Sequence, residues 1–162
     1  YPPLGRRGYA APVVRGSGFG TVPGYGTGAA AEDLLLIVQC EHADAVADIE
    51  ALTAVDGVDM VFIGPNDLAG SMGLLEQLEA PALHAAFDRV EAAVSASGKW
   101  LGTITGPGRG WAELAAKGHR LIVGPNDVSF LIAGARAAAA EARDDRGHGA
   151  PASDAPRTGY SP

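Results

Sequence analysis

Four short, mostly apolar runs divide the chain, at 34–39, 58–63, 100–105 and 121–123. Each run is flanked by residues that are typical of turns, and none is long enough for a buried helix. An uninterrupted apolar run of this length is typical of a strand that is buried on both faces of a parallel sheet. The four runs therefore predict four parallel strands.

Helices are expected between and after these strands. The best-defined helix begins at Pro81 and ends before Gly98, and these residue types are preferred at the two ends of a helix. Its apolar positions form one stripe that is expected to be core: Leu83, Phe87, Val90 and Val94. The other helices are expected at 42–54, 111–117 and 128–143. Because strands and helices alternate, the sequence predicts an α/β fold with a parallel sheet and helices packed outside it.

The tetrapeptide Gly-Pro-Asn-Asp closes two of the predicted strands, at 64–67 and again at 124–127. A repeat at the carboxyl ends of strands is typical of a (β/α)8 barrel of the TIM type, where the loops at that end carry function. A doubly wound sheet is the competing fold. Its nucleotide-binding versions are disfavoured, because no Gly-x-Gly-x-x-Gly follows the first predicted strand.

Charge and hydropathy exclude several classes of protein. The net charge of −7 and the isoelectric point near 4.9 remove the electrostatic reason to expect nucleic acid or an anionic membrane as a partner. No apolar run approaches the roughly 18–20 residues of a membrane-spanning helix. Cys40 is the single cysteine, so no intrachain disulfide forms, and this usage fits a reducing, cytoplasmic compartment.

The two ends of the chain differ from its middle. Residues 1–33 are rich in glycine, proline and alanine without periodicity, which predicts an irregular loop. Residues 144–162 also lack periodicity and predict a disordered tail. We therefore expect one domain at 1–143, followed by the tail at 144–162.

Polar residues stand at the carboxyl ends of the first two predicted strands. Side chains alternate along a strand, so Gln39 and Glu41 share one face, while Cys40 points to the other. Asp67 lies at the equivalent end of the next strand, and two converging carboxylates make a hard-oxygen site suited to Mg²⁺ or Mn²⁺. The alternative is a helix-capping Asp67 and a solvent-exposed Glu41.

Three motifs, in order along the chain, resemble the HpcH/HpaI aldolase family of class II pyruvate aldolases. The motifs are Tyr-Pro-Pro-Leu-Gly-Arg-Arg-Gly at 1–8, Val-Gln-Cys-Glu at 38–41 and Val-Asp-Gly-Val-Asp-Met-Val-Phe-Ile-Gly-Pro-Asn-Asp-Leu at 55–68. The resemblance extends to about residue 140. It implies a (β/α)8 barrel in which the strands found here are the last four.

The resemblance also implies a site and a reaction. Glu41 and Asp67 would be the ligands of a divalent metal, Mg²⁺ or Mn²⁺, with Co²⁺ as a further possibility. Gln39 would support the metal site and contact the substrate, and the backbone at Asn66 and Asp67 would bind the pyruvate carboxylate. The expected reaction is the cleavage of a 4-hydroxy-2-oxo acid into pyruvate and an aldehyde, in a full-length enzyme that forms homo-oligomers.

A barrel of this kind takes about 250 residues, so the chain is expected to be the C-terminal half of one. The resemblance places the catalytic base in the other half, and the base is therefore unknown here. Asn126 and Asp127, in the second tetrapeptide, are expected to be turn and helix-cap residues. Two other functions stay open: an enzyme like the citrate lyase β-chain or malyl-CoA lyase, and a non-catalytic half barrel.

Overall fold

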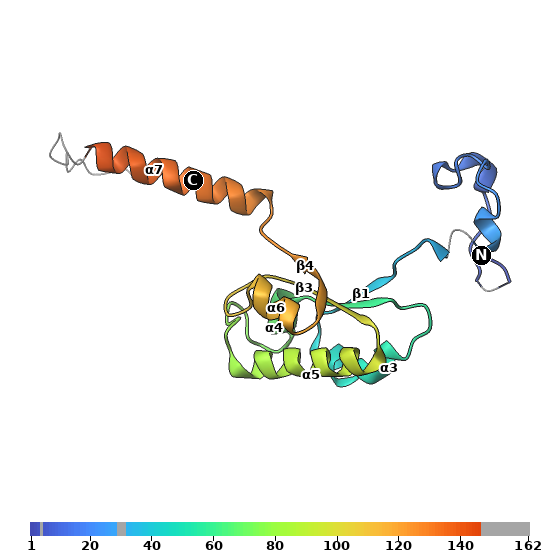
Figure 1. Ribbon diagram of the computed structural model, residues 1–162, viewed down its shortest axis with the longest axis horizontal. Helices are drawn as coiled ribbons and strands as arrows, with labels where there is room; N and C mark the ends of the chain where they lie inside the picture. Colours follow the sequence, from blue (N-terminus) through green and yellow to red (C-terminus); the bar gives the residue numbers. More distant parts are fainter. Residues whose placement is uncertain (4, 29–31, 147–162) are drawn as a thin grey trace, which may run out of the picture. The chain divides into compact units, whose positions relative to one another are not determined.

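The computed structural model describes residues 1–3, 5–28 and 32–146 (Figure 1). These residues belong to two compact units, which span Tyr1–Val123 and Gly124–Pro162. Within the described residues, the first unit contains all the strands, and the second contains one helix, α7 (Asp127–Arg146).

The first unit is built on a parallel sheet of four strands. They are β1 (Ile37–Cys40), β2 (Met60–Ile63), β3 (Trp100–Ile104) and β4 (His119–Val123). Their order in the sheet is β1-β2-β3-β4, so every neighbour in space is also the next strand in sequence. This order is that of consecutive βα units in a barrel, and the predicted α/β fold with a parallel sheet is confirmed.

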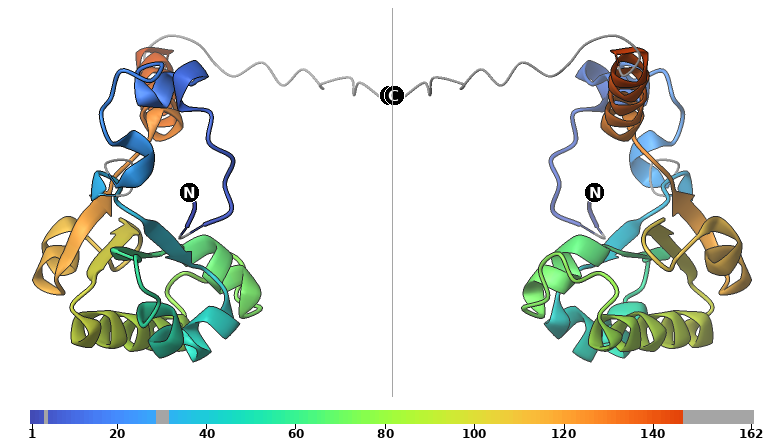
Figure 2. Two further views of the ribbon diagram at one scale, coloured as in Figure 1. Left: turned by 90° about the vertical axis from the view of Figure 1, so that its right-hand side faces the viewer. Right: turned by 90° about the vertical axis from the view of Figure 1, so that its left-hand side faces the viewer.

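Five helices connect or follow these strands in the first unit. They are α2 (Ala43–Ala47), α3 (Ile49–Thr53), α4 (Pro65–Ser71), α5 (Pro81–Ser97) and α6 (Trp111–Ala116). Helix α5 lies along one face of the sheet, with α3 beside it (Figure 1, Figure 2). It begins at Pro81 and ends before Gly98, whose positive φ of 75° closes the helix, as the sequence predicts.

The core of the first unit lies between the sheet and α5. The predicted stripe of Leu83, Phe87, Val90 and Val94 is fully buried there. Alternate strand residues face these side chains from the sheet: Cys40, Val61, Ile63 and Leu101. Burial of apolar surface at this layer is the main stabilising contribution to the unit.

The first strand and first helix differ from their predicted ranges. The strand begins at Ile37 rather than at residue 34, because the side chain of Asp59 accepts the Leu36 N–H at 2.7 Å in place of a ladder bond. The helix predicted over 42–54 is two short helices, α2 and α3, which are separated at Asp48, where φ is −99° and ψ is 21°.

Helix α4 is an element that the sequence patterns did not predict. Gly64-Pro65 at the end of β2 is typical of a turn, but Gly64 is the residue before the helix and Pro65 is its first residue. Proline is favoured at that position because its missing N–H has no partner in the first turn of a helix. Asp67 therefore lies in the first turn of α4.

The two ends of the chain are described only in part. Among the described residues of 1–28, the regular elements are short 3-10 turns at Ala11–Val13, Arg15–Ser17 and Tyr25–Thr27, in agreement with an irregular loop. Helix α7 continues three residues beyond the predicted end at 143, and the rest of the expected tail, 147–162, lies outside the described residues. Across the described ranges, no helix has the length and apolarity to cross a membrane.

Candidate active site

Gln39 and Glu41 lie together at the carboxyl end of β1. The Gln39 amide Nε2 donates a hydrogen bond of 2.9 Å to Glu41 Oε2. Cys40, between them, is completely buried in the core on the opposite face. The predicted alternation is therefore confirmed, with Gln39 and Glu41 turned away from the helix layer.

Gly64 provides the space that the Glu41 carboxylate occupies. Its N–H donates to the Cys40 carbonyl at 3.2 Å, which joins the ends of β1 and β2. A Cβ atom at position 64 would lie 3.0 Å from both the Cβ and Oε2 of Glu41, which is tighter than ordinary van der Waals contact. Glycine at this position therefore lets the carboxylate lie over the start of α4.

Asp67 and Asn66 follow from the neighbouring strand, because β1 and β2 are paired up to Cys40 and Ile63. Both lie in the first turn of α4 and are exposed, whereas Glu41 is half-buried. No side chain caps the start of this helix. In the first turn of a helix, the backbone N–H groups have no partner within the helix, so those of Asn66 and Asp67 are not used by α4 itself.

The donor set at this edge consists of two carboxylates. Within the described ranges, no group of three or more His, Cys, Asp or Glu side chains is arranged to hold a metal ion. Two carboxylates, completed by water and substrate oxygens, are a normal ligand set for Mg²⁺ in enzymes. The residues present thus fit a hard divalent cation that shares its coordination with a substrate.

Cys40 is a structural residue. Burial of the thiol, reinforced by the negative charge of Glu41, raises its pKa to about 11. We expect iodoacetamide at about pH 8 to leave Cys40 unmodified in the folded chain and to alkylate it after denaturation in urea, because the thiolate is the reactive form. Mass spectrometry measures the result, and rapid alkylation of the folded chain would contradict this placement.

The second Gly-Pro-Asn-Asp segment has a local role, as predicted. Asn126 Oδ1 accepts hydrogen bonds of 2.9 Å from both the N–H and the hydroxyl of Ser129. Asp127 Oδ1 accepts the Val128 N–H, also at 2.9 Å. These bonds satisfy donors at the start of α7 and make the segment a helix cap.

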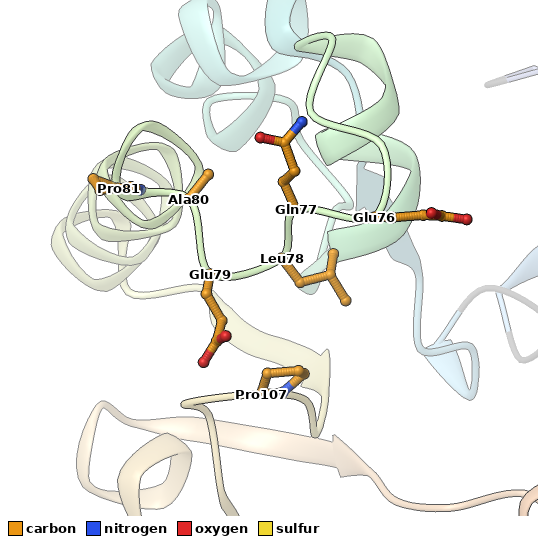
Figure 3. A pocket seen from close by; sticks show the side chains of 7 residues that line it. All are labelled: Glu76, Gln77, Leu78, Glu79, Ala80, Pro81 and Pro107. Carbon is orange, nitrogen blue, oxygen red and sulfur yellow. The ribbon is translucent and has the colours of Figure 1, made fainter.

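Two cavities lie near the carboxyl end of the sheet, and neither is lined by Glu41 or Asp67. The larger, about 360 Å³, is lined by the connection between α4 and α5 and by Pro107. Figure 3 shows Leu78 and Glu79 on its Pro107 side, with Gln77 directed away. The smaller, about 140 Å³, separates Asn66 and Pro65 from the loop after β3.

A buried cluster of charged residues joins α5, the loop after β3 and the start of β4, and the sequence patterns did not identify it. Glu91 of α5 is 7% exposed, and its Oε1 accepts from Arg109 Nη2 at 2.6 Å and from His119 Nε2 at 3.0 Å. Its Oε2 accepts from Lys117 Nζ at 3.0 Å. His119 lies outside the predicted strand run of 121–123, but it is the buried first residue of β4. The available signal was Glu91 itself, four residues after Phe87 on the buried face of the helix.

The contacts of Glu91 make the free energy of unfolding depend on pH. Burial alone would raise the pKa of Glu91, but hydrogen bonds from His119, Arg109 and Lys117 outweigh burial and lower it to about 2. Because the folded pKa lies below the unfolded value, Glu91 stabilises the fold above about pH 5, and this contribution is lost as the pH falls. Relative to Glu91→Gln, the free energy of unfolding should fall by about 2 kcal/mol between pH 5 and pH 3. Urea denaturation of both proteins at several pH values measures the free energy of unfolding. A difference in this free energy that stays constant with pH would contradict the prediction.

The fold and the acidic residues at the carboxyl end of the sheet together define a class of protein. Four consecutive parallel strands joined by helices, with acidic side chains at the carboxyl ends of adjacent strands, are characteristic of a TIM-type (β/α)8 barrel. The family model of HpcH/HpaI aldolase/citrate lyase matches residues 12–133. The chain belongs to this family, and its recognition from the sequence motifs is confirmed.

Individual relatives agree with this assignment. The chain is 42% identical to a hydroxypyruvate/pyruvate aldolase of Roseobacter denitrificans, over 82% of this chain and 51% of the relative. It is 36% identical to a protein of the same name from Cupriavidus necator, over 99% of this chain and 59% of the relative. The chain thus spans about half the length of the curated relatives it matches.

A solved structure shows the same relationship in space. An HpcH/HpaI aldolase/citrate lyase family protein from Burkholderia cenocepacia is 38% identical, with a TM-score of 0.78. The similarity covers 87% of this chain and 54% of that protein. The partial TIM-type barrel expected from the sequence is therefore confirmed.

Proposed function

We propose that this chain supplies the metal- and pyruvate-binding part of a class II aldolase, a carbon–carbon lyase. The reaction is the cleavage of a 4-hydroxy-2-oxo acid into pyruvate and an aldehyde. The observation that carries the proposal is the position of Glu41 and Asp67 at the carboxyl ends of adjacent strands, in a chain of this family. Two relatives named hydroxypyruvate/pyruvate aldolase support pyruvate as the product.

Glu41 and Asp67 would hold Mg²⁺ or Mn²⁺, with Co²⁺ as a further candidate. When bound, the cation supplies Lewis-acid stabilisation of the negative charge that develops on the keto oxygen of the substrate. Gln39 fixes the orientation of the Glu41 carboxylate through the hydrogen bond between Nε2 and Oε2. Such hydrogen bonds to a metal ligand keep it in the geometry that binding needs.

Substrate binding would use Gln39 and the start of α4. The backbone N–H groups of Asn66 and Asp67 are available to donate to the pyruvate carboxylate, because the helix does not use them. Gln39 is exposed beside Glu41, so its amide can also contact the substrate. These contacts would hold the pyruvate unit in one orientation during bond cleavage.

The cleavage itself needs a base. The base removes the proton of the 4-hydroxyl, the bond between C3 and C4 breaks, and its electron pair remains on the three-carbon fragment, which is protonated at C3 to give pyruvate. None of the residues proposed for this site in the chain is assigned to that proton transfer. We propose that the base comes from the part of the barrel that the chain does not span.

The experiment that tests this proposal follows pyruvate release from a 4-hydroxy-2-oxo acid in the presence of Mn²⁺. One sample contains the chain alone. The other adds a separately produced segment covering the part of the Roseobacter denitrificans aldolase that this chain does not match. Release only in the combined sample is expected. Pyruvate release by the chain alone would contradict the proposal that the base lies outside it. No pyruvate release in either sample would count against the aldolase assignment.

A further inference from the structure

The loop after β3, residues 105–110, forms part of the carboxyl edge next to the proposed site. Its sequence is Thr-Gly-Pro-Gly-Arg-Gly, and glycine at three of six positions gives the free backbone a wide range of conformations. Together with Pro65 and Asn66, the loop lines the cavity of about 140 Å³. Its position therefore determines the space beside Asn66, a proposed substrate-binding residue.

Few backbone bonds hold this loop. The Gly106 N–H donates to the Arg109 carbonyl at 3.2 Å, and the Arg109 N–H donates back to Gly106 at 3.0 Å. The Thr105 N–H donates to the Val123 carbonyl at 2.9 Å, which fixes the start of the loop to β4. The first pair closes the turn on itself, the Thr105 bond fixes one end to β4, and the Gly110 carbonyl joins the other end to α6 by accepting the Leu114 N–H at 3.0 Å.

The side chain of Arg109 attaches the middle of the loop to α5. Although Gly106, Pro107 and Gly108 are exposed, Arg109 is only 5% exposed, and its guanidinium lies 4.3 Å from the centre of the Phe87 ring. Its Nη2 donates to Glu91 Oε1, so the loop is anchored to the middle of α5 by an ion pair and a cation–π contact.

Glu91 is itself held from two further segments. Lys117, directly after α6, and His119, the first residue of β4, both contact its carboxylate. Lys117 also pairs with Asp88 at 2.9 Å. Because the carboxylate is fixed on several sides and mostly buried, the position of Arg109 follows from it. Breaking a buried pair leaves an uncompensated charge and is costly.

We propose that Glu91 and Arg109 are positioning residues, which hold the loop at 105–110 on α5, across the 140 Å³ cavity from the start of α4, and so preorganise the carboxyl edge for substrate binding. The loop is attached independently of the metal ligands, and its connection to substrate binding rests on the proposed function. Both residues act through the position of the loop and of the cavity beside Asn66.

The first test measures amide hydrogen exchange by NMR in the full chain. Arg109→Met removes the ion pair while keeping an unbranched side chain, and Glu91→Gln removes the charge of its partner. In Arg109→Met, we expect the backbone amide hydrogens at positions 106 and 109 to exchange about tenfold faster or more. The exchange rates of the β2 amides should be unchanged. Unchanged exchange of the loop amides would overturn the proposal.

Two further variants separate the loop attachment from general stability. Lys117→Met removes a contact with Glu91 that does not involve the loop, so loop exchange should change less than about twofold. If it changed as much as in Arg109→Met, the cluster would be a general stabilising element and the proposal would be wrong. Arg109→Lys keeps the charge without the planar guanidinium and should give intermediate exchange even if Arg109→Met does not fold.

The second test connects the loop to the site. At saturating Mn²⁺, Arg109→Met should bind pyruvate several-fold more weakly, with its affinity for Mn²⁺ unchanged. A faster-exchanging loop with unchanged pyruvate affinity would overturn the positioning role. If the unmodified chain binds neither Mn²⁺ nor pyruvate, the proposed function and the substrate-positioning role both fail. The exchange data then still decide whether Glu91 and Arg109 hold the loop.

Discussion

Asp67→Asn is expected to weaken the binding of Mn²⁺ to this chain by about a hundredfold or more, because it removes one of two anionic ligands. Glu41→Gln should have an effect of the same size, since it removes the other carboxylate next to Gly64. Isothermal titration calorimetry measures both affinities. The substitutions are nearly isosteric, so a large loss of affinity reports on charge and coordination rather than on packing.

The chain contains its own matched control. Asp127 occupies the same place in a second Gly-Pro-Asn-Asp segment, but its carboxylate accepts the Val128 N–H at the start of α7. Asp127→Asn should therefore leave the affinity for Mn²⁺ unchanged. If Asp127→Asn weakened binding as much as Asp67→Asn, or if neither substitution had an effect, the assignment of the metal ligands would be wrong.

Phe87→Ala is expected to lower the free energy of unfolding of the first unit by about 3–5 kcal/mol, the cost of removing a large side chain from a packed core. Phe87 is 1% exposed, lies in the main cluster between the sheet and α5, and supports the guanidinium of Arg109. Urea denaturation followed by circular dichroism measures the change. The substitution removes both apolar contacts and the ring face on which Arg109 lies.

Phe130→Ala provides the comparison for this result. Phe130 lies on α7 and is 66% exposed, so its replacement should change stability by no more than about 0.5 kcal/mol. A loss of less than about 1 kcal/mol in Phe87→Ala would show that the core around α5 is not packed as described.

Elements with strong local signals were predictable from the sequence. Helix α5 carries a four-residue apolar stripe between Pro81 and Gly98, and its observed ends coincide with the predicted ones. The start of β1 was not predictable, because Leu34 and Leu35 have the composition of a strand but no strand partner, and both are exposed. A hydrophobic run indicates which residues tend to be buried, whereas hydrogen bonding to the neighbouring strand determines where a strand begins.

The candidate site also contains one part that the sequence predicts and another that it does not. The relation of Gln39, Cys40 and Glu41 follows from strand alternation alone, and the structure confirms it. The attachment of the loop after β3 could not be predicted from the sequence. Glu91 and Arg109 are 18 residues apart, and their contact depends on how α5 packs. Tertiary pairs of this kind leave only an indirect trace in sequence, here an acidic residue on an apolar helix face.

The central claim is that this chain carries the metal and pyruvate site of an aldolase, and the coupling between the two ligands tests it most directly. Mn²⁺ is titrated calorimetrically into the unmodified chain, first without pyruvate and then with pyruvate at saturation. We predict one saturable Mn²⁺ site per chain, whose affinity rises by about tenfold when pyruvate is present, because each ligand completes the binding site of the other. An absence of saturable binding, or an affinity that pyruvate leaves unchanged, would contradict the claim.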